Sequence, residues 1–393
     1  MLVCECEGRW KQERDALLHL KAIAGLKEWG EKKWVDGTDC CRWSGVRCNT
    51  RRRVSELNLS WMRDDEDLGN WYLNLSDFQA FDDIKILQLH DNNIAGFVEK
   101  KGNEIFLWQV SLESLDLSVN QLSNDYIISF LSGFQHLKSL DLSYNQLEGS
   151  LDINGICALS KLERLDLSYN FNIGGFVVPQ GNERFSWQTC RPEVLALSHN
   201  NLSNDITSSF NWFSHLKFLD LSYNQLEGSL DISGICALSK LEELNLSYND
   251  NISGFVVPQG TNIYLDNLKV LHLEGLKMDG SMLRQSLRAF SSVRELYMNS
   301  STFNGTIVAA DFGDLVKLEK LILDESSNIG NEFLKSIGVL TSLKVLSLNS
   351  CGIKGSFPIE GWSELKKLEV QYPIASVNFL LRLKKGNLSL LMK

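Results

Sequence analysis

The sequence predicts an α/β repeat fold in which short parallel strands stack side by side into a solenoid, and three observations predict it. Leucine accounts for 64 of the 393 residues. The motif L-x-x-L-x-L-x-x-N recurs through most of the chain. Apolar residues make up 44% of the chain, an ordinary share, and they are spaced at regular intervals. Such spacing is typical of repeat architectures, so the length indicates one long repetitive domain and not two or three globular ones.

The repeat motif is complete five times, starting at Leu112, Leu137, Leu162, Leu216 and Leu241. Weaker copies start at Val54, Ile84, Pro192, Leu268, Val293, Leu318 and Leu343, and a degraded copy starts at Leu365. Successive starts lie 22 to 30 residues apart, most often 25. Residues 137–180 match residues 216–259 almost word for word, and the offset of 79 residues is three repeats. A three-repeat block has therefore been duplicated.

Each position of the motif has an expected structural role. Alternation along a strand sends its two leucines to one face and the residue between them to the other, so stacked repeats form a parallel sheet with an apolar inner side. The asparagine ends the strand, and its amide can bind backbone groups of neighbouring turns. We expect a ladder of such asparagines, which decays where the position holds Leu276, Ser301, Ser326 and Cys351. Serine and cysteine keep one donor, whereas leucine has none.

Charge and motifs exclude several classes of function. The formal net charge of −10 argues against a duplex nucleic acid held through its phosphates. No apolar run reaches the roughly 18–20 residues that span a bilayer, and the first residues show no secretion signal. No hydrolase, zinc-protease, phosphate-loop or kinase motif occurs, so we expect no enzyme, cofactor or metal. The acidic run at residues 64–67 lacks the spacing of a calcium loop and is interpreted as a solvated insertion.

Five of the nine cysteines lie within the first 48 residues, at Cys4, Cys6, Cys40, Cys41 and Cys48. Such clustering favours a small disulfide-linked module. The alternative is a zinc site, but the usual Cys-x2-Cys pairs are absent.

The repeats and the first 50 residues together resemble the plant-specific class of leucine-rich repeats, with the N-terminal cap of plant receptor-like proteins and receptor kinases. The resemblance rests on the glycine shortly after the asparagine, as at Gly149 and Gly228, and on residues 13–18 and 39–48. It implies a right-handed solenoid, a horseshoe or superhelical arc, with a helical cap. It also implies the disulfides Cys41–Cys48 and Cys6–Cys40, with Cys4 as the rival of Cys6.

The domain organisation follows from the resemblance and from its limits. We expect a cap at residues 1–52, about 12 or 13 leucine-rich repeats at residues 53–372, and an irregular tail without a C-terminal cap at residues 373–393. Because a secretion signal, a cysteine-bearing C-terminal cap and a membrane helix are all missing, we expect a truncated or alternatively spliced ectodomain fragment. In the full-length family that ectodomain lies on the extracellular face of the plasma membrane.

The residues between the strand leucines, and those two positions after the second leucine, form two rows on the surface. The predicted ligand-binding face combines Asp116, Asp141, Asp166 and Asp220 with Tyr144, Tyr169, Tyr223 and Tyr248. Carboxylates beside tyrosines suit a peptide or protein that carries basic residues. The alternative is that these residues are repeat consensus multiplied by the duplication. His199 and His272 are interpreted as chance surface residues.

Eight Asn-x-Ser/Thr sequons are candidate glycosylation sites: Asn58, Asn74, Asn201, Asn245, Asn251, Asn299, Asn304 and Asn387. A glycan on Asn58 or Asn245 would stand on the predicted face and confine ligands to the stretch between them.

The resemblance implies a non-enzymatic recognition module of a plant cell-surface receptor-like protein. Such a module binds a peptide, protein or pathogen-derived ligand in defence or development and signals through a partner kinase. One alternative is a secreted protein similar to polygalacturonase inhibitors, although those end in a cysteine cap. Another is a fragment without independent function, because its last repeats would expose an apolar edge.

Overall fold

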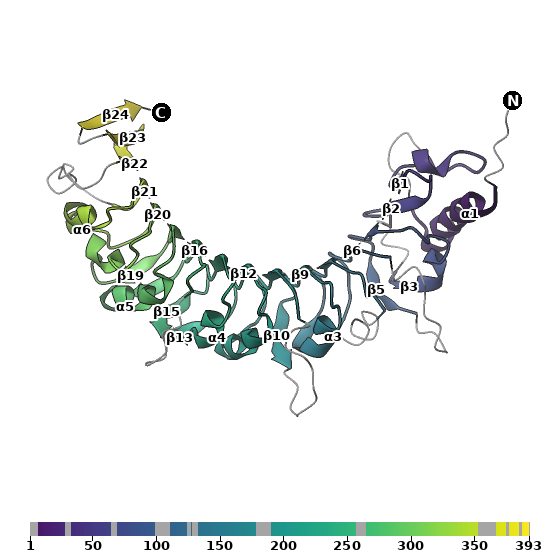
Figure 1. Cartoon of the computed structure of the whole chain (residues 1–393), viewed down its shortest axis with the longest axis horizontal. Coiled ribbons are helices and arrows are strands. Elements are labelled where there is room, and N and C mark those ends of the chain that lie inside the picture. The colour runs from purple at the N-terminus through teal and green to yellow at the C-terminus, as the bar shows by residue number, and fades with distance from the viewer. Residues whose placement is uncertain are drawn as a thin grey trace. The chain divides into compact units, whose positions relative to one another are not determined.

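The computed structural model describes residues 7–27, 33–63, 69–98, 111–123, 127, 133–177, 190–256, 265–352, 367–374, 377–384 and 387–392. It divides into two compact units, Met1–Leu195 and Ala196–Lys393, and each is described by itself. Within each unit the strands of the main sheet lie along one edge and the short helices lie along the opposite edge (Figure 1). This is the stacked-repeat arrangement that the sequence predicts.

The first unit holds the cap and the N-terminal repeats. Its main sheet has the order β1 (Val46–Cys48), β2 (Val54–Asn58), β4 (Ile86–Gln88), β6 (Ser114–Asp116), β7 (Ser139–Asp141) and β9 (Arg164–Asp166). β1 is antiparallel to β2, and the later neighbours are parallel. β11 (Val194–Ala196) lies at the boundary of the two units.

The second unit continues the same pattern. Its parallel strands follow the order β12 (Phe218–Asp220), β14 (Glu243–Asn245), β16 (Val270–His272), β18 (Glu295–Tyr297), β20 (Lys320–Ile322), β21 (Val345–Ser347) and β22 (Lys367–Ile374). β23 (Val377–Lys384) and β24 (Asn387–Met392) then add antiparallel to β22. The structure differs here from the irregular tail that the sequence predicts. The repeat motif is absent, but a short link is enough to place leucine-rich strands in antiparallel order.

The chain forms a second set of short strands after the ladder position. They pair in parallel as β3 (Trp71–Leu73) with β5 (Ile94–Phe97), β8 (Glu148–Asp152) with β10 (Asn172–Val177), β13 (Glu227–Asp231) with β15 (Asn251–Val256), and β17 (Lys277–Asp279) with β19 (Thr302–Asn304).

Short helical segments follow these strands and return the chain to the main sheet. The α-helices are α3 (Ile153–Cys157), α4 (Ser233–Cys236), α5 (Leu283–Leu287) and α6 (Asn331–Ser336). The 3₁₀ segments are η3 (Leu75–Phe78), η5 (Asn204–Trp212), η6 (Gly280–Met282), η7 (Arg288–Phe290), η8 (Ala309–Phe312) and η9 (Ile337–Val339). Fully buried phenylalanines, among them Phe78, Phe134, Phe210, Phe290 and Phe333, fill the interior beside the strand leucines.

The asparagine ladder is present. Asn145 Nδ2 donates to the carbonyls of Leu117, Leu142 and Ser143, and its Oδ1 accepts from the amide of Leu122. Asn145 thus binds backbone of its own turn and of the turn before it, as do Asn92, Asn120, Asn170, Asn224 and Asn249.

The ladder continues with weaker residues in the second unit, as the sequence predicts. Ser301 Oγ donates to Leu273, Ser326 Oγ donates to Met298, and Cys351 Sγ donates to Leu323. Leu276 is buried and supplies only apolar surface.

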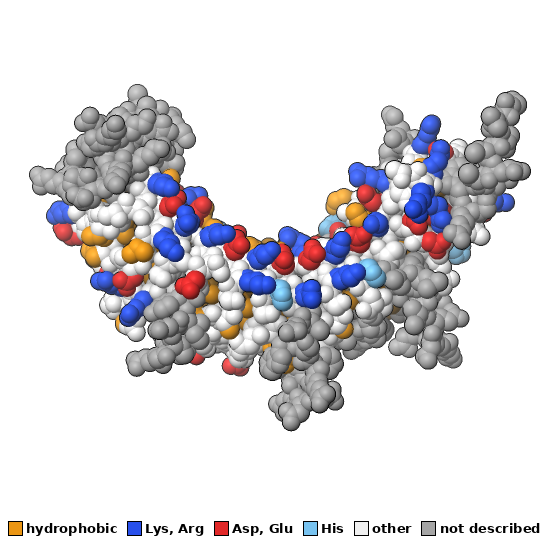
Figure 2. All heavy atoms as spheres, viewed as in Figure 1, with side chains coloured by type: hydrophobic (Ala, Val, Ile, Leu, Met, Phe, Trp, Pro, Cys, Tyr) orange, Lys and Arg blue, Asp and Glu red, His pale blue; other side chains and the backbone are white. Residues whose placement is uncertain are grey.

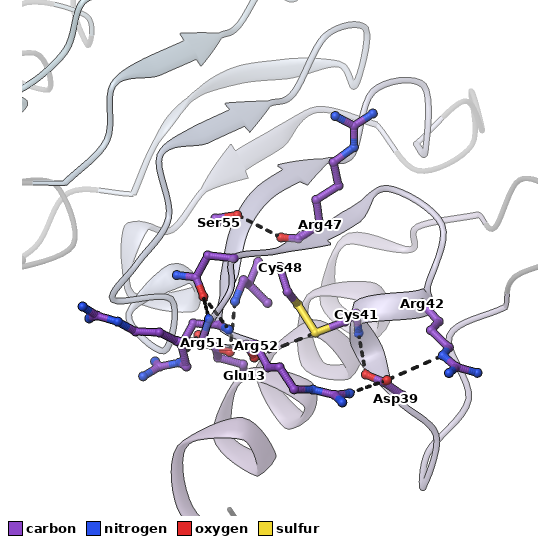
Figure 3. Close-up of a disulfide and its surroundings, with 12 residues drawn as sticks. Glu13, Asp39, Cys41, Arg42, Arg47, Cys48, Arg51, Arg52 and Ser55 are labelled. Carbon is purple, nitrogen blue, oxygen red and sulfur yellow. Dashed lines mark hydrogen bonds and ion pairs between the residues drawn. A yellow bond between two sulfur atoms is a disulfide. The ribbon is translucent and has the colours of Figure 1, made fainter.

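The cap begins with α1 (Glu7–Ala24), the helix that the resemblance implies. Cys41 and Cys48 form the implied disulfide, with an S–S distance of 2.04 Å, and Asp39 accepts from the Cys41 amide beside it (Figure 3). Gly45 has a φ of +77°, and a Cβ on Gly45 would lie 2.2 Å from the Asn58 carbonyl oxygen, so only glycine fits the join between η1 (Cys40–Arg42) and β1.

The second implied disulfide, Cys6–Cys40, is not formed. Cys40 is a free thiol with no exposed surface, and burial raises its pKa to about 11, with the charge of Glu13 adding to the rise. Cys4 and Cys6 lie outside the described residues.

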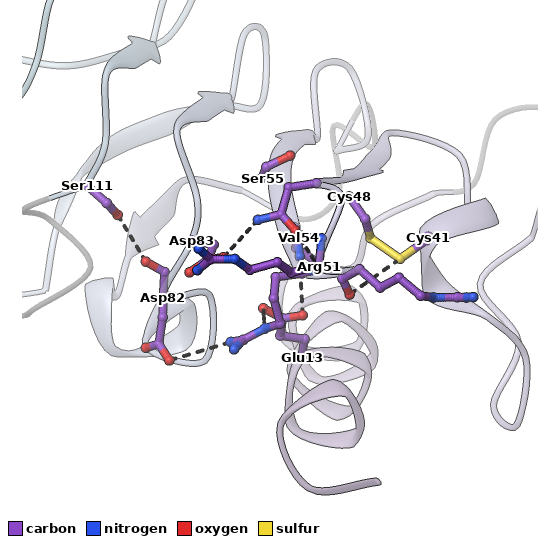
Figure 4. Close-up of polar contacts among 12 residues, drawn as sticks. Glu13, Cys41, Cys48, Arg51, Val54, Ser55, Asp82, Asp83 and Ser111 are labelled. Atoms are coloured by element: carbon purple, nitrogen blue, oxygen red, sulfur yellow. Dashed lines mark hydrogen bonds and ion pairs between the residues drawn. A yellow bond between two sulfur atoms is a disulfide. The ribbon is translucent and has the colours of Figure 1, made fainter. Parts of the chain in front are cut away.

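A buried ion pair joins the cap to the first repeat. The Glu13 carboxylate, which has no exposed surface, accepts from Arg53 Nε at 2.8 Å and from the Val54 amide at 3.2 Å (Figure 4). Asn49 Nδ2 donates to Asp83 at 2.8 Å and ties the cap to the next coil. Burial raises the pKa of Glu13, and the bonds from Arg53 and Val54 oppose that rise.

A further disulfide was not predicted. Cys157 at the end of α3 is bonded to Cys190, 33 residues later. The two cysteines belong to different repeats, and no spacing rule of the motif pairs them.

The ladder can be tested with Asn145→Ala. This change leaves buried carbonyls and the Leu122 amide without partners, and we expect a loss of roughly 2–4 kcal/mol in unfolding free energy. Gln146→Ala is the matched control, because Gln146 is exposed and should change stability by no more than about 0.5 kcal/mol. Urea denaturation followed by circular dichroism measures both, and equal effects would contradict the role of the ladder.

The cap ion pair can be tested with Arg53→Met, which leaves Glu13 buried without its cation. We expect a loss of about 3–5 kcal/mol in unfolding free energy. The double variant Arg53→Met with Glu13→Gln should recover part of that loss, because no buried charge then remains. A double variant less stable than Arg53→Met in the same denaturation assay would show that Glu13 acts by packing alone.

Candidate ligand-binding face

The predicted aspartates of the first unit form one continuous row. Parallel pairing sets Asp116 opposite Asp141 and Asp141 opposite Asp166. Adjacent strands of a sheet lie about 4.8 Å apart, so the three carboxylates are immediate neighbours. We call Asp116, Asp141 and Asp166 the acidic row.

Each carboxylate of the acidic row also serves its own turn. Asp141 Oδ1 accepts from the Ser143 amide at 2.9 Å and from Ser143 Oγ at 2.7 Å, and Asp116 accepts in the same way from Ser118. Asp166 accepts from the Ser168 amide. One oxygen of each carboxylate therefore stabilises its own turn.

The acidic row is poorly neutralised. Among the described residues, none of its three carboxylates forms an ion pair. Burial raises the pKa of Asp141, the bonds from Ser143 oppose the rise, and the charges of Asp166 and Asp116 add to it. A cation placed over the row would relieve this repulsion.

A neighbouring row is neutralised internally. Glu113 binds Lys85 at 2.6 Å and Lys138 at 2.7 Å, and these hydrogen bonds, that of Lys138 first, lower the pKa of Glu113 to about 2. Glu319 is bound in the same way by Lys344 and Arg294. Acidic and basic side chains accordingly alternate along the visible face of each unit (Figure 2).

The predicted tyrosines stand beside the strands in stacked pairs. Tyr144 and Tyr169 stack with ring centroids 3.9 Å apart, and Tyr223 and Tyr248 stack at 4.4 Å. All four have a positive φ between 53° and 58°. This left-handed turn costs energy for a residue other than glycine, and it turns the ring outward next to its neighbour. Tyr144, Tyr223 and Tyr248 remain 37–47% exposed.

The second unit does not extend the acidic row. Asp220 accepts from the Ser222 amide and lies opposite Asn245, which pairs in turn with His272. The structure thus groups three of the four predicted aspartates and places Asp220 beside neutral residues.

Both histidines that the sequence analysis set aside belong to these rows. His199 has a φ of 54° and stacks on Tyr223 at 4.1 Å. His272 stacks on Tyr297 at 4.6 Å and lies between Glu243, at 3.3 Å, and Glu274, at 3.2 Å. Their interpretation as chance surface residues stays a prediction, but both side chains contact the neighbouring repeat. Their positions in the repeat were the available signal, because His199 occupies the tyrosine position and His272 the aspartate position.

Family models match the cap and several of the repeats. The model of the Leucine rich repeat N-terminal domain matches residues 11–49. Models of the Leucine Rich Repeat match residues 135–150, 215–238 and 237–254. The chain is a leucine-rich repeat protein.

The relatives of this leucine-rich repeat protein include plant receptor-like proteins, as the resemblance implies. Cuscuta receptor 1 of Solanum lycopersicum is 31% identical over 94% of this chain and 34% of its own length. Receptor-like protein 41 of Arabidopsis thaliana is 32% identical over 42% of this chain and 16% of its own length. The chain therefore spans about a third or less of the length of these relatives.

Solved structures share the fold. The crystal structure of PEPR1-AtPEP1 is 26% identical with a TM-score of 0.57, covering 91% of this chain and 48% of that one. An internalin (inlF) from Listeria monocytogenes is 18% identical with a TM-score of 0.52, covering 93% of this chain and 95% of that one. The second likeness shows the leucine-rich repeat fold alone.

Several sequons lie on accessible surface of the leucine-rich repeat protein. Asn58, Asn201, Asn251 and Asn304 are exposed, whereas Asn74, Asn245 and Asn299 are half-buried. The side chain of Asn387 lies outside the described residues. Asn58 and Asn245 occupy the strand position of the acidic row, and glycosylation at any of the eight stays a prediction.

Neither a metal-binding cluster nor a membrane-spanning helix is found among the described residues. Within them, no group of three or more His, Cys, Asp or Glu side chains is arranged to hold a metal ion. In the same part of the chain, no helix is long and apolar enough to cross a membrane. The acidic run at residues 64–67 lies outside the described residues.

The environment of His272 predicts a pH dependence of stability. Burial lowers the pKa of His272, but the hydrogen bond to Glu274 and the charges of Glu274 and Glu243 outweigh it, so the pKa is raised above 6.5. The stability gained from the charged form is fully present below 6.5, the value taken for the unfolded chain, and is lost as the pH rises through the folded-state pKa. Between about pH 5.5 and 8.5, the wild type should lose more stability than His272→Gln.

The measurement is the imidazole titration by NMR, paired with urea denaturation at both ends of the range. Glu274→Gln should lower the pKa of His272 because it removes one of the two facing carboxylates. Identical titration curves in the wild type and Glu274→Gln would contradict this account.

Proposed function

We propose that this chain is the non-enzymatic recognition part of a plant cell-surface receptor-like protein. It lies outside the plasma membrane and signals through a partner kinase, in defence or development. The relatives support this proposal, since Cuscuta receptor 1 and Receptor-like protein 41 carry receptor names. The fold likeness to PEPR1, solved as a complex with AtPEP1, supports a ligand of peptide or protein class.

The ligand in this proposal carries basic residues and binds over the acidic row. The observation that carries this step is the alignment of Asp116, Asp141 and Asp166 in register, without ion-pair partners among the described residues. Like charges held side by side attract a cation strongly, and the electrostatic part of such binding weakens with salt. The stacked rings of Tyr144 and Tyr169 lie alongside and offer contact area at small entropic cost.

The proposal predicts that Asp141→Asn weakens binding of a lysine- or arginine-rich peptide about 3- to 10-fold and reduces its salt dependence. Asparagine preserves the turn, because Asn58 and Asn245 at equivalent positions accept from Ser60 and Ser247 in the same way. Binding should also weaken as the pH falls through the raised pKa of Asp141, since its carboxylate then loses its charge.

Asp220→Asn is the matched control, because Asp220 occupies the position of Asp141 in the duplicated block but lies beside Asn245. Its effect should be smaller than that of Asp141→Asn. Isothermal titration of both variants at two salt concentrations makes the comparison. Unchanged affinity in Asp141→Asn would remove the acidic row from the binding site.

A further inference from the structure

Two tyrosines of the first unit stack across adjacent repeats. Tyr144 and Tyr169 occupy the same position of the motif, and both have a left-handed backbone, with φ of 53° and 58°. The Tyr144 amide donates to the Ser168 carbonyl at 2.9 Å, which holds the two turns side by side. We call Tyr144 and Tyr169 the tyrosine pair.

The rings of the tyrosine pair lie face to face. Their centroids are 3.9 Å apart and their planes differ by 10°. A hydrogen bond to Tyr169 raises the pKa of Tyr144, so both hydroxyls lie at the same end of the stack. Because the rings are nearly parallel and point the same way, each carbon of one ring lies opposite its counterpart in the other. The ortho carbons beside the two hydroxyls (Cε) therefore face each other at about the centroid separation.

The tyrosine pair is accessible from solvent. Tyr144 is 47% exposed and Tyr169 is half-buried. An oxidant in solution therefore reaches the ring of Tyr144 directly. An electron that leaves Tyr169 for an oxidised Tyr144 has only the stacking distance to cross.

We propose that the tyrosine pair is an oxidative cross-linking site, at which a haem peroxidase with hydrogen peroxide joins the two rings as dityrosine. Each hydroxyl gives up one electron and one proton, which leaves two tyrosyl radicals and reduces the peroxide to two water molecules. A carbon–carbon bond then forms between the facing ortho carbons. The hydrogen on each of these carbons moves as a proton to the ring oxygen, which restores both phenols. The product has lost two hydrogen atoms in total.

The face-to-face arrangement favours this bond over other couplings. The unpaired electron of a tyrosyl radical occupies orbitals perpendicular to the ring, spread over the oxygen and the ortho carbons. Two stacked rings direct these orbitals at each other. Coupling through oxygen needs the oxygen of one ring over an ortho carbon of the other, whereas in the tyrosine pair the two oxygens lie together.

The duplicated block contains a second stacked pair under tighter restraint. Tyr223 and Tyr248 have centroids 4.4 Å apart. His199 stacks on Tyr223 at 4.1 Å, and a Cβ at Gly275 would lie 2.5 Å from the Tyr248 ring. Both rings of the second pair therefore have close neighbours besides each other, and their centroids start farther apart. We expect the tyrosine pair of the first unit to couple first.

The cross-link forms a covalent bridge between two repeats. It closes the loop between residues 144 and 169, which restricts the unfolded chain in the way that a disulfide does. The asparagine ladder already joins the same repeats, since Asn170 Nδ2 donates to the Leu142 carbonyl at 3.0 Å, so the bridge preserves the native register. The reaction depends on the two rings alone and not on any ligand of the acidic row.

The experiment is brief oxidation of the full chain, at low protein concentration, with a haem peroxidase and hydrogen peroxide. We expect dityrosine fluorescence in the monomer and, after proteolysis, a cross-linked peptide that contains residues 144 and 169. Tyr169→Phe keeps the stacked ring but removes one phenol, and it should lose most of this fluorescence. Tyr223→Phe, the same change in the second pair, should retain it. Oxidised wild type should melt roughly 5 °C or more above oxidised Tyr169→Phe.

Three results would contradict the proposal. Fluorescence found only in covalent dimers would show that the coupling occurs between chains. Equal fluorescence from wild type and Tyr169→Phe would place the reaction at other tyrosines. Equal melting temperatures after oxidation would show that no bridge holds the two repeats. Asp141→Asn should cross-link as the wild type does, which separates this site from the acidic row and from the proposed function.

Discussion

Buried peptide groups at the turn after each strand need hydrogen-bond partners, and the asparagine ladder supplies them. In a solenoid, the backbone hydrogen bonds of one repeat cannot all be formed within that repeat. Each turn therefore offers carbonyl groups to the turn that follows. Asn145 binds the carbonyls of Leu117 and Leu142 at once, which ties two repeats together and fixes their register. Where the position becomes serine or cysteine, the side chain donates one bond to the preceding turn. Strand pairing, the buried leucines and the alignment of surface rows all depend on this register.

The same turn creates the surface on which recognition is proposed. To present the asparagine inward, the residue before it adopts a left-handed conformation, and its side chain is directed outward. Tyrosine or histidine at this position stacks on its neighbour one repeat away, as Tyr144 does on Tyr169 and His199 does on Tyr223. The left-handed backbone conformation recurs at this position in successive repeats, whereas the side chain there varies. The acidic row arises similarly, because one oxygen of each aspartate accepts a hydrogen bond from its own turn.

The duplicated block shows how this freedom is used. Its two copies share strands and core, yet Asp166 corresponds to Asn245 and Phe171 to Asp250. Both differences lie on the exposed rows. The interior differs too: Cys157 is bonded to Cys190, whereas its counterpart Cys236 is a buried free thiol. The first copy therefore has more negative charge on the strand face, and Phe171 adds one more ring beside the stacked tyrosines.

The sequence by itself determined the strands, the ladder with its decay, the Cys41–Cys48 disulfide implied by the cap, and the aspartate and tyrosine positions. These follow from local rules, since alternation and one polar residue per turn act within a single repeat. The tertiary structure alone decided which side chains from different repeats meet. Glu13 reaches Arg53 across 40 residues, and His272 lies between two glutamates contributed by different segments. The tertiary structure also decided that the tail pairs as antiparallel strands. It likewise placed Gln121, Gln146 and Tyr144 around one hollow. The motif fixes the register of the strands, so contacts between repeats depend on the side chains at the variable positions, which the motif does not specify.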